Sequence, residues 1–542
     1  MAKLDATTFA APGPGTWLLD AVHFHGPVSR YHAGLFPACL RDGFRDGTRR
    51  YGLLFDTLEF RIVNGFGYFC AVPAPEPETA ARIATAEAAY GVRLWRDDMD
   101  RWEREVRPES IRAGLELQAV DPAALTDDEL VAYVDRCIAH HGRMIRQHHS
   151  FNVAALLPIG DLMASVAAWT GLPLDPIVAL VRGAAPESAG TFPELDALAV
   201  ALREHASVET LLDPKLSPAE VISGLRAEPG GLGDAARTYL DLVGHRLLDS
   251  VDAASPTVIE KPSVLVEGVR RAVATSGAAS NVASQREIAA IRDLVPAGAR
   301  DEFDELLAEA RRTARLRDER GLYSDVWAGG LSRRALLAAG ARQVERGRLH
   351  AAADLVEAGP DEIRSLLTGA NTPSADDLAA RARYRSTHRL SDAPKFLGPP
   401  PQPPAPLHGL PENAARMMRA VGMIMGGIFA SPEQHDATIL RGRGVSAGDY
   451  TGIARVVRGP DDFDRIQSGD VLVTETTTDA LGVALPLLGA IVTDSGGVLS
   501  HAGIVAREFG IPAVVGCGDA TARIAEGTKV RVDGATGEVQ LL

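Results

Sequence analysis

A proline-rich stretch at residues 398–411 constrains the fold of this chain more than any other feature. It holds seven prolines, so it is extended, semi-rigid and unsuited to the interior of a helix or a central strand. Helix-type spacing of apolar residues dominates before it, and short β-type runs follow it. The sequence therefore predicts a mainly helical domain at 1–397, a proline-rich linker and hinge at 398–439, and a compact α/β domain at 440–542.

The N-terminal part is predicted to contain many helices and one β-hairpin. Capping signatures at Thr126–Glu129, Ser217–Glu220 and Ser284–Glu287 precede runs with apolar residues three and four apart, which is typical of amphipathic helices. Two runs with β-type character, Leu58–Val63 and Gly67–Val72, flank an Asn-Gly turn, the strongest short-range signal of a hairpin. The fold class predicted is thus a multi-domain protein, mainly helical before the linker and α/β after it.

Composition narrows the possible partners and the compartment. The net charge of −15 disfavours nucleic acid and acidic membrane surfaces as partners. No run approaches the 18–20 apolar residues of a membrane span, and the first 15 residues lack the apolar core of a signal peptide. The four cysteines are scattered without Cys-x-x-Cys spacing, so we expect reduced thiols, no metal site and a cytoplasmic location.

The residues that carry chemistry lie between Thr493 and Gly516. A β-type run ends there, Gly496 and Gly497 permit a tight turn, and Ser500 is placed to cap a helix on whose first turn His501 falls. The free N–H groups and partial positive charge of a helix N-terminus attract anions. An imidazole there can carry a phosphoryl group; the plain alternative is a strand–turn–helix with an incidental surface histidine.

The wider pattern resembles the swivelling phosphohistidine domain of the phosphoenolpyruvate-utilising enzyme family. The segment Gly-Gly-x-x-Ser-His-Ala through Arg-Glu-x-Gly-Ile-Pro-Ala-Val-Val-Gly follows that family's signature. Upstream, Gly444–Gly448 and Thr478-Asp479 occur in the family's order, and 532–539 matches its closing segment. The resemblance implies that His501 is the phosphoryl carrier. It also implies a phosphohistidine loop formed by Gly496, Gly497, Ser500 and Arg507.

The helical part weakly resembles the substrate domains of phenylphosphate synthase and rifampicin phosphotransferase. The matching pieces include Asp20–Phe24, the Asn-Gly turn and Tyr239 through Gly244-His-Arg246. The resemblance implies a substrate-binding domain, with candidate contacts at His23, Asn64, His245 and Arg246. The alternative for His245 is a role in capping a helix, and the alternative for Arg246 is a surface salt bridge. His23 is expected to contact the substrate from an extended segment.

Four histidines lie close together within 140–149. His141 and His148 fall on the apolar face of the helix expected there, whereas His140 and His149 fall off it. The inward pair is two turns apart, too far for joint binding of a metal ion. We therefore expect core histidines.

The resemblance also implies a source and a destination for the phosphoryl group. No glycine-rich phosphate cradle with a lysine occurs in the sequence, so a separate ATP-grasp protein is expected to phosphorylate His501, with Mg²⁺ and ATP at that partner. The acceptor would be the hydroxyl of a small organic molecule. Three alternatives stay open: a phosphorylation-driven ligase or dehydratase of a natural-product pathway, a non-catalytic phosphocarrier, and a degenerate binding protein.

Overall fold

The computed structural model of the protein forms two compact units. It describes residues 8–542 apart from 22, 185–192, 249, 275–282, 403–406, 429–437, 460–461, 463–464 and 478–486. Unit 1 comprises residues 1–157, 250–255 and 320–422, and unit 2 comprises 158–249, 256–319 and 423–542. The sequence predicted three consecutive segments, with boundaries after residues 397 and 439. That division stays a prediction.

Unit 1 contains a small antiparallel sheet with the strand order β2-β3-β1-β4. Its strands are β1 (Trp17–Leu19), β2 (Phe55–Val63), β3 (Phe66–Pro73) and β4 (Phe396–Leu397). Asn64 and Gly65, with φ of 49° and 86°, join β2 to β3 in the left-handed conformation that a two-residue hairpin turn requires. The predicted hairpin is confirmed, and strands distant in sequence extend it to four.

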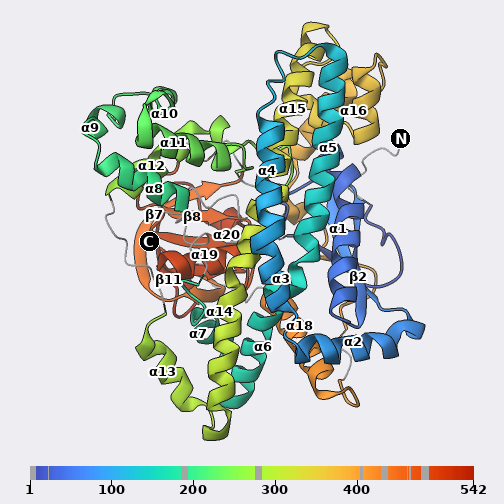
Figure 1. Ribbon diagram of the computed structural model, residues 1–542, viewed down its shortest axis with the longest axis vertical. Helices are drawn as coiled ribbons and strands as arrows, with labels where there is room; N and C mark the ends of the chain where they lie inside the picture. Colours follow the sequence, from blue (N-terminus) through green and yellow to red (C-terminus); the bar gives the residue numbers. More distant parts are fainter. Residues whose placement is uncertain are drawn as a thin grey trace. The chain divides into compact units, whose positions relative to one another are not determined.

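Long helices build most of unit 1. They are α1 (Arg30–Arg50), α2 (Thr79–Gly91), α3 (Trp95–Arg101), α4 (Arg107–Gln118), α5 (Asp127–Ser150), the first residues of α6 (Asn152–Thr170), α15 (Asp325–Glu345), α16 (Pro360–Leu367), α17 (Ala375–Thr387) and much of α18 (Glu412–Ile428). Helix α5 lies beside both α1 and α15 (Figure 1). Thr126 and Glu129 cap α5 reciprocally, which confirms the predicted start of this helix.

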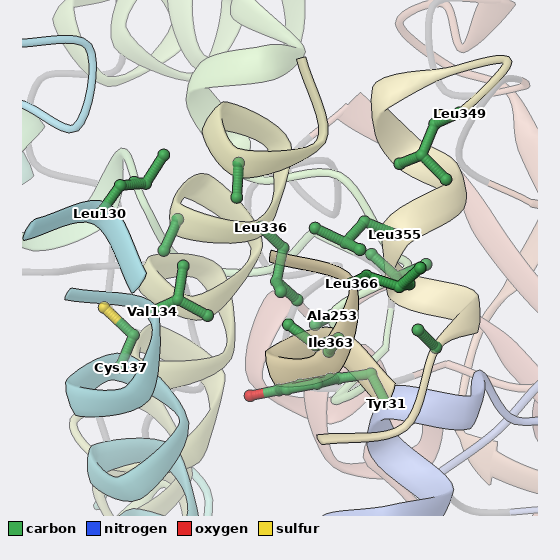
Figure 2. Close-up of a cluster of buried hydrophobic side chains, with 14 of the residues drawn as sticks. Tyr31, Leu130, Val134, Cys137, Ala253, Leu336, Leu349, Leu355, Ile363 and Leu366 are labelled. Atoms are coloured by element: carbon green, nitrogen blue, oxygen red, sulfur yellow. The ribbon is translucent and has the colours of Figure 1, made fainter. Parts of the chain in front are cut away.

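The core of unit 1 is assembled from these helices. Figure 2 shows side chains of α1, α5, α15 and α16 meeting, among them Tyr31, Val134, Leu336 and Ile363, each at most 1% exposed. Burial of such side chains is the main stabilising contribution to a helical domain. The helical stretch Asp127–Thr170 has the length and hydropathy of a membrane span, but 72% of its most apolar window is buried, as in the core helix of a globular protein.

The rest of the helices belong to unit 2. They are the remainder of α6, with α7 (Leu174–Ala179), α8 (Pro193–Arg203), α9 (Val208–Leu211), α10 (Pro218–Ala227), α11 (Gly230–Val243), α12 (Pro262–Ala274), α13 (Gln285–Leu294), most of α14 (Arg300–Leu322), α19 (His501–Phe509) and α20 (Ala520–Arg523). Capping boxes at Ser217 and Ser284 begin α10 and α13. Both predicted helix starts are confirmed.

An eight-stranded sheet dominates the C-terminal part of unit 2, in the order β5-β12-β11-β7-β8-β9-β10-β6. The strands are β5 (Ile439–Arg441), β6 (Arg443–Ser446), β7 (Asp449–Val457), β8 (Val471–Thr474), β9 (Ala490–Thr493), β10 (Ala513–Val515), β11 (Lys529–Asp533) and β12 (Glu538–Leu541). Strands β7 to β10 are parallel, and α19 is the helix that connects β9 to β10. The predicted α/β class of this part is confirmed.

Candidate functional site

His501 is the first residue of α19, directly after the loop that leaves β9. The loop therefore starts at the carboxyl end of a parallel strand, where open α/β sheets bind their ligands. Ser500 is the N-cap, and its Oγ accepts a hydrogen bond from Gly503 N at 3.4 Å. Other N–H groups of the first turn, which have no carbonyl partner within the helix, give this end the anion preference of a helix N-terminus.

Two glycines give the loop its shape. Gly496 has φ of 118°, and a Cβ there would lie 2.8 Å from Ser500 Oγ, so both the backbone conformation and the space favour glycine. The carbonyl of Gly497 accepts hydrogen bonds from Ser500 N at 3.0 Å and from Ser500 Oγ at 2.8 Å. These contacts fix the residue immediately before His501.

Arg507 holds the loop from inside the protein. Its Nη1 donates to Val445 O at 2.9 Å, and its Nη2 donates to Val498 O at 2.5 Å. The side chain is buried, and burial lowers the pKa of its guanidinium to about 10, which leaves it charged at neutral pH. Arg507 therefore positions the loop residue Val498 relative to β6.

The hydroxyl of Thr477 lies 3.0 Å from His501 Nδ1. Thr477 is 4% exposed and follows β8, the strand next to β9. If Nδ1–H donates to this hydroxyl, the lone pair of the imidazole is at Nε2. Thr477 was not predicted from the sequence. The feature that could have pointed to it is the adjacent pair Thr478-Asp479 of the family pattern, which lies outside the described residues.

The last turn of α18 also contacts the loop. Leu499 N donates a hydrogen bond to Gly427 O at 2.9 Å. A Cβ at Gly427 would lie 3.1 Å from Leu499 Cδ1, so the close approach needs glycine or a shift of the leucine. The residue two positions before His501 is thus tied to a helix within the predicted hinge segment.

We expect Thr477→Val to slow phosphorylation of His501 about tenfold, because the free energy of one lost hydrogen bond to the reacting ring corresponds to about that factor in rate. Thr477→Ser should retain most of the rate, because it keeps the hydroxyl. Single-turnover incorporation of ³²P into each variant measures the effect. Equal rates for the valine and wild-type proteins would show that the contact does not orient the ring.

His245 and Arg246 follow α11 in unit 2. Arg246 is 3% exposed, and its backbone carbonyl accepts a hydrogen bond from Val258 N at 2.9 Å. Burial excludes the alternative of a surface salt bridge for Arg246. The substrate role of His245 and Arg246 stays a prediction.

His23 and Asn64 lie in unit 1. Asn64 occupies the hairpin turn. Its Nδ2 donates a hydrogen bond to Thr8 O, and its backbone carbonyl accepts one from Tyr384 Oη at 2.8 Å. These contacts give Asn64 a structural role, and a substrate role stays a prediction.

His23 lies in a bend, not in the extended segment expected. Its Nδ1 is 2.7 Å from Asp20 Oδ2, so the structure adds a carboxylate partner that the sequence analysis did not assign.

Comparison with known protein families matches two regions. Residues 466–537 match the mobile domain of PEP-utilising enzymes, and residues 147–318 match the fourth domain of rifampicin phosphotransferase. The first match contains the loop, the helix and the histidine described above. The chain is therefore similar to phosphoenolpyruvate-utilising enzymes over its C-terminal α/β part and to rifampicin phosphotransferase over residues 147–318.

Similar proteins extend this result over most of the chain. A rifampicin phosphotransferase from a Streptomyces species is 30% identical over 66% of this chain and 40% of its own length. The phosphotransferase YvkC of Bacillus subtilis is 30% identical over 45% of this chain and 28% of its own length. The chondramide synthase CmdD of Chondromyces crocatus is 27% identical over 97% of this chain and 14% of its own length. The chain thus spans less than half of each of these relatives.

Proposed function

We propose that this chain is a phosphotransferase component of dikinase type. A separate ATP-grasp protein, with ATP and Mg²⁺, phosphorylates His501, and the mobile domain passes the phosphoryl group to the hydroxyl of a small organic acceptor. The observation that carries the proposal is His501 on the first turn of α19, behind a capped, glycine-shaped loop, with Nδ1 3.0 Å from Thr477 Oγ1.

The chemistry follows from this geometry. With Nδ1 protonated toward Thr477, Nε2 attacks a phosphorus atom of the ATP phosphate chain, and the bridging oxygen bound to that phosphorus leaves with the bonding pair. In the second step the acceptor oxygen attacks phosphorus, the N–P bond breaks, and the hydroxyl proton passes to a base. The N–H groups at the start of α19 favour the anionic phosphoryl oxygens in both steps.

A second candidate is a phosphorylation-driven ligase or dehydratase of a natural-product pathway. Similarity to a chondramide synthase over 97% of this chain favours it. Both candidates share phospho-His501 but differ in product. A phosphotransferase leaves the phosphoryl group on the acceptor, whereas a dehydratase or ligase releases it as inorganic phosphate.

The test is incubation of the chain with ATP, Mg²⁺ and ATP-grasp proteins encoded near it, followed by intact-protein mass spectrometry. We expect a gain of one phosphoryl group that acid removes. Product analysis after adding candidate acceptors then separates phosphorylated acceptor from free phosphate. Failure of every donor protein to label the chain would contradict both candidates.

Replacement of Arg246 by alanine tests the predicted acceptor side. We expect phosphorylation of His501 to proceed as in the wild type, and discharge to the acceptor to slow by about 10²-fold, because only the second step would use this cation. Rapid-quench measurement of each half-reaction gives the two rates. An unchanged discharge rate would remove Arg246 from the acceptor site.

A further inference from the structure

The helix that begins with His501 contributes to a small cavity within unit 2. The cavity has a volume of about 20 Å³. Its lining includes Arg182 from the turn after α7, Arg317 from α14, and Ile504 and Glu508 from α19. All of these residues belong to unit 2. The cavity therefore lies where α19 meets two helical segments that are distant from it in the sequence.

One face of α19 carries both His501 and this lining. Ile504 is three residues after His501 and Glu508 is seven residues after it, and positions with this spacing share one face of an α-helix. Ile504 and Glu508 are both buried. The turn after α7 and α14 therefore cover the later part of the face that begins with His501.

A hydrogen bond joins α19 directly to the turn after α7. Glu508 Oε2 accepts it from Gly183 N at 2.8 Å, across 325 positions of the sequence. The turn is itself held in place, because Ala283 N donates a hydrogen bond to Arg182 O at 3.2 Å. The Glu508 carboxyl thus links the helix that begins with His501 to a braced turn.

The cations from the facing elements are paired with other carboxylates. Arg182 Nη2 lies 2.9 Å from Glu287 Oε1, and Arg317 Nε lies 2.8 Å from Asp318 Oδ1. Each of these guanidinium charges is therefore compensated before Glu508 is considered. Glu508 is also the next-to-last residue of α19, where the partial negative charge of a helix C-terminus disfavours an anion.

Burial favours the neutral acid further. It raises the pKa of the Glu508 carboxyl to about 7, against smaller opposing effects of the Gly183 N–H, Arg317 and Arg507. Arg507, the neighbouring cation on α19, also interacts with Asp175 of α7. A neutral carboxyl keeps its carbonyl oxygen as an acceptor for the Gly183 N–H, and its own O–H can donate to a water molecule, for which the cavity has room.

We propose that the Glu508 carboxyl is a proton-dependent latch: in its neutral form it holds α19 against the turn after α7 and against α14, and loss of its proton weakens this attachment. The inference rests on the proposed function, because the latch would control when the helix that begins with His501 is available to the donor protein. Glu508 is a positioning residue, since it acts through the helix and not on the reacting atoms.

The direction of the pH dependence follows from the raised pKa of Glu508. The attached state binds the proton more tightly than a released glutamate in water, whose ordinary pKa is about 4.3. Attachment is therefore favoured at low pH, and this advantage is lost as the pH rises from about 4.3 to about 7. Above pH 7 Glu508 is ionised in both states, so no further change is expected.

Hydrogen exchange of the Gly183 amide in the full chain, without ATP or a donor protein, tests the latch. We expect its protection factor to be at least about fivefold higher at pH 5.5 than at pH 8. Glu508→Gln keeps an acceptor oxygen but cannot ionise, so it should retain the high protection at both pH values.

Glu526→Gln is the matched control for Glu508→Gln. Glu526 Oε2 also accepts a hydrogen bond from a backbone N–H, that of Val456, at 2.8 Å, but its side chain is 35% exposed. The Glu526→Gln protein should show the wild-type pH dependence at Gly183.

The consequence for the site is measured as the single-turnover rate of His501 phosphorylation by the donor protein. At pH 8 we expect Glu508→Gln to be phosphorylated at least about fivefold more slowly than the wild type, because its latch stays closed. At pH 5.5 the two rates should be equal. The ratio of the two proteins at each pH removes the pH dependence of the donor itself.

Equal protection of Gly183 at pH 5.5 and pH 8 in the wild-type protein would overturn the proposal, whether or not the Glu508→Gln protein folds. So would the wild-type pH dependence in Glu508→Gln, or equal phosphorylation rates of Glu508→Gln and wild type at pH 8. If no donor protein labels His501 in any variant, the proposed function fails, while the exchange measurement still decides whether the latch exists.

Discussion

His501→Ala will abolish acid-labile phosphorylation and lower overall turnover by more than about 10³-fold, because the covalent intermediate cannot form without the imidazole. Mass spectrometry and ³²P labelling of the variant, with the donor protein and ATP present, measure the loss. The variant should fold normally, since the Ser500 cap and the α19 sequence remain.

His350→Ala is the control for this experiment, because His350 is an exposed histidine of unit 1. It should be labelled as well as the wild type. Acid-labile phosphate on the His501→Ala protein would mean that another residue carries the phosphoryl group, and the role assigned to the α19 N-terminus would then be wrong.

Arg507→Met should destabilise the C-terminal sheet domain by about 2–5 kcal/mol. The change removes hydrogen bonds from a buried cation and leaves Val445 O and Val498 O without these donors. Hydrogen exchange of amides in β8 and β9 across a urea series measures the effect within the full chain. Phosphorylation of His501 should slow as well, because Val498 belongs to its loop.

Arg441→Met is the matched control for Arg507→Met. Arg441 pairs with Glu538 at 3.0 Å on the surface, with its side chain 41% exposed, and such pairs contribute about 0–1 kcal/mol. If both variants lose equal stability, the buried contacts of Arg507 are not what holds the loop.

The start and the end of α19 could be predicted because the residues that determine them are local. Ser500 caps the helix, and Gly510, with φ of 65°, ends it in the left-handed conformation. The short β-type runs that follow the linker correspond to strands β7 to β11. The edge strands β5 and β6 and the strand β12 beside β5 were not predicted, since they are only three or four residues long and contain few buried apolar residues.

Contacts between distant residues could not be predicted. Thr477 is 24 positions from His501, and Asp325 is 177 positions from His148; no local pattern encodes either pair. The helical periodicity of α5 indicates one apolar face, but α1 and α15 cover more of the helix than that face. The burial of His140 and His149 comes from this tertiary packing.

The hydrogen bond from Leu499 N to Gly427 O limits which residues of the predicted segment 398–439 can act as a hinge. While that bond holds, we expect the last turn of α18 to move together with the loop before His501, so this turn cannot itself be the hinge. The boundary between the two units falls after Gly422, one turn earlier, in a helix that also contains Gly426. Glycines weaken helices, so we expect the hinge predicted from the sequence to lie within this helix, near Gly422.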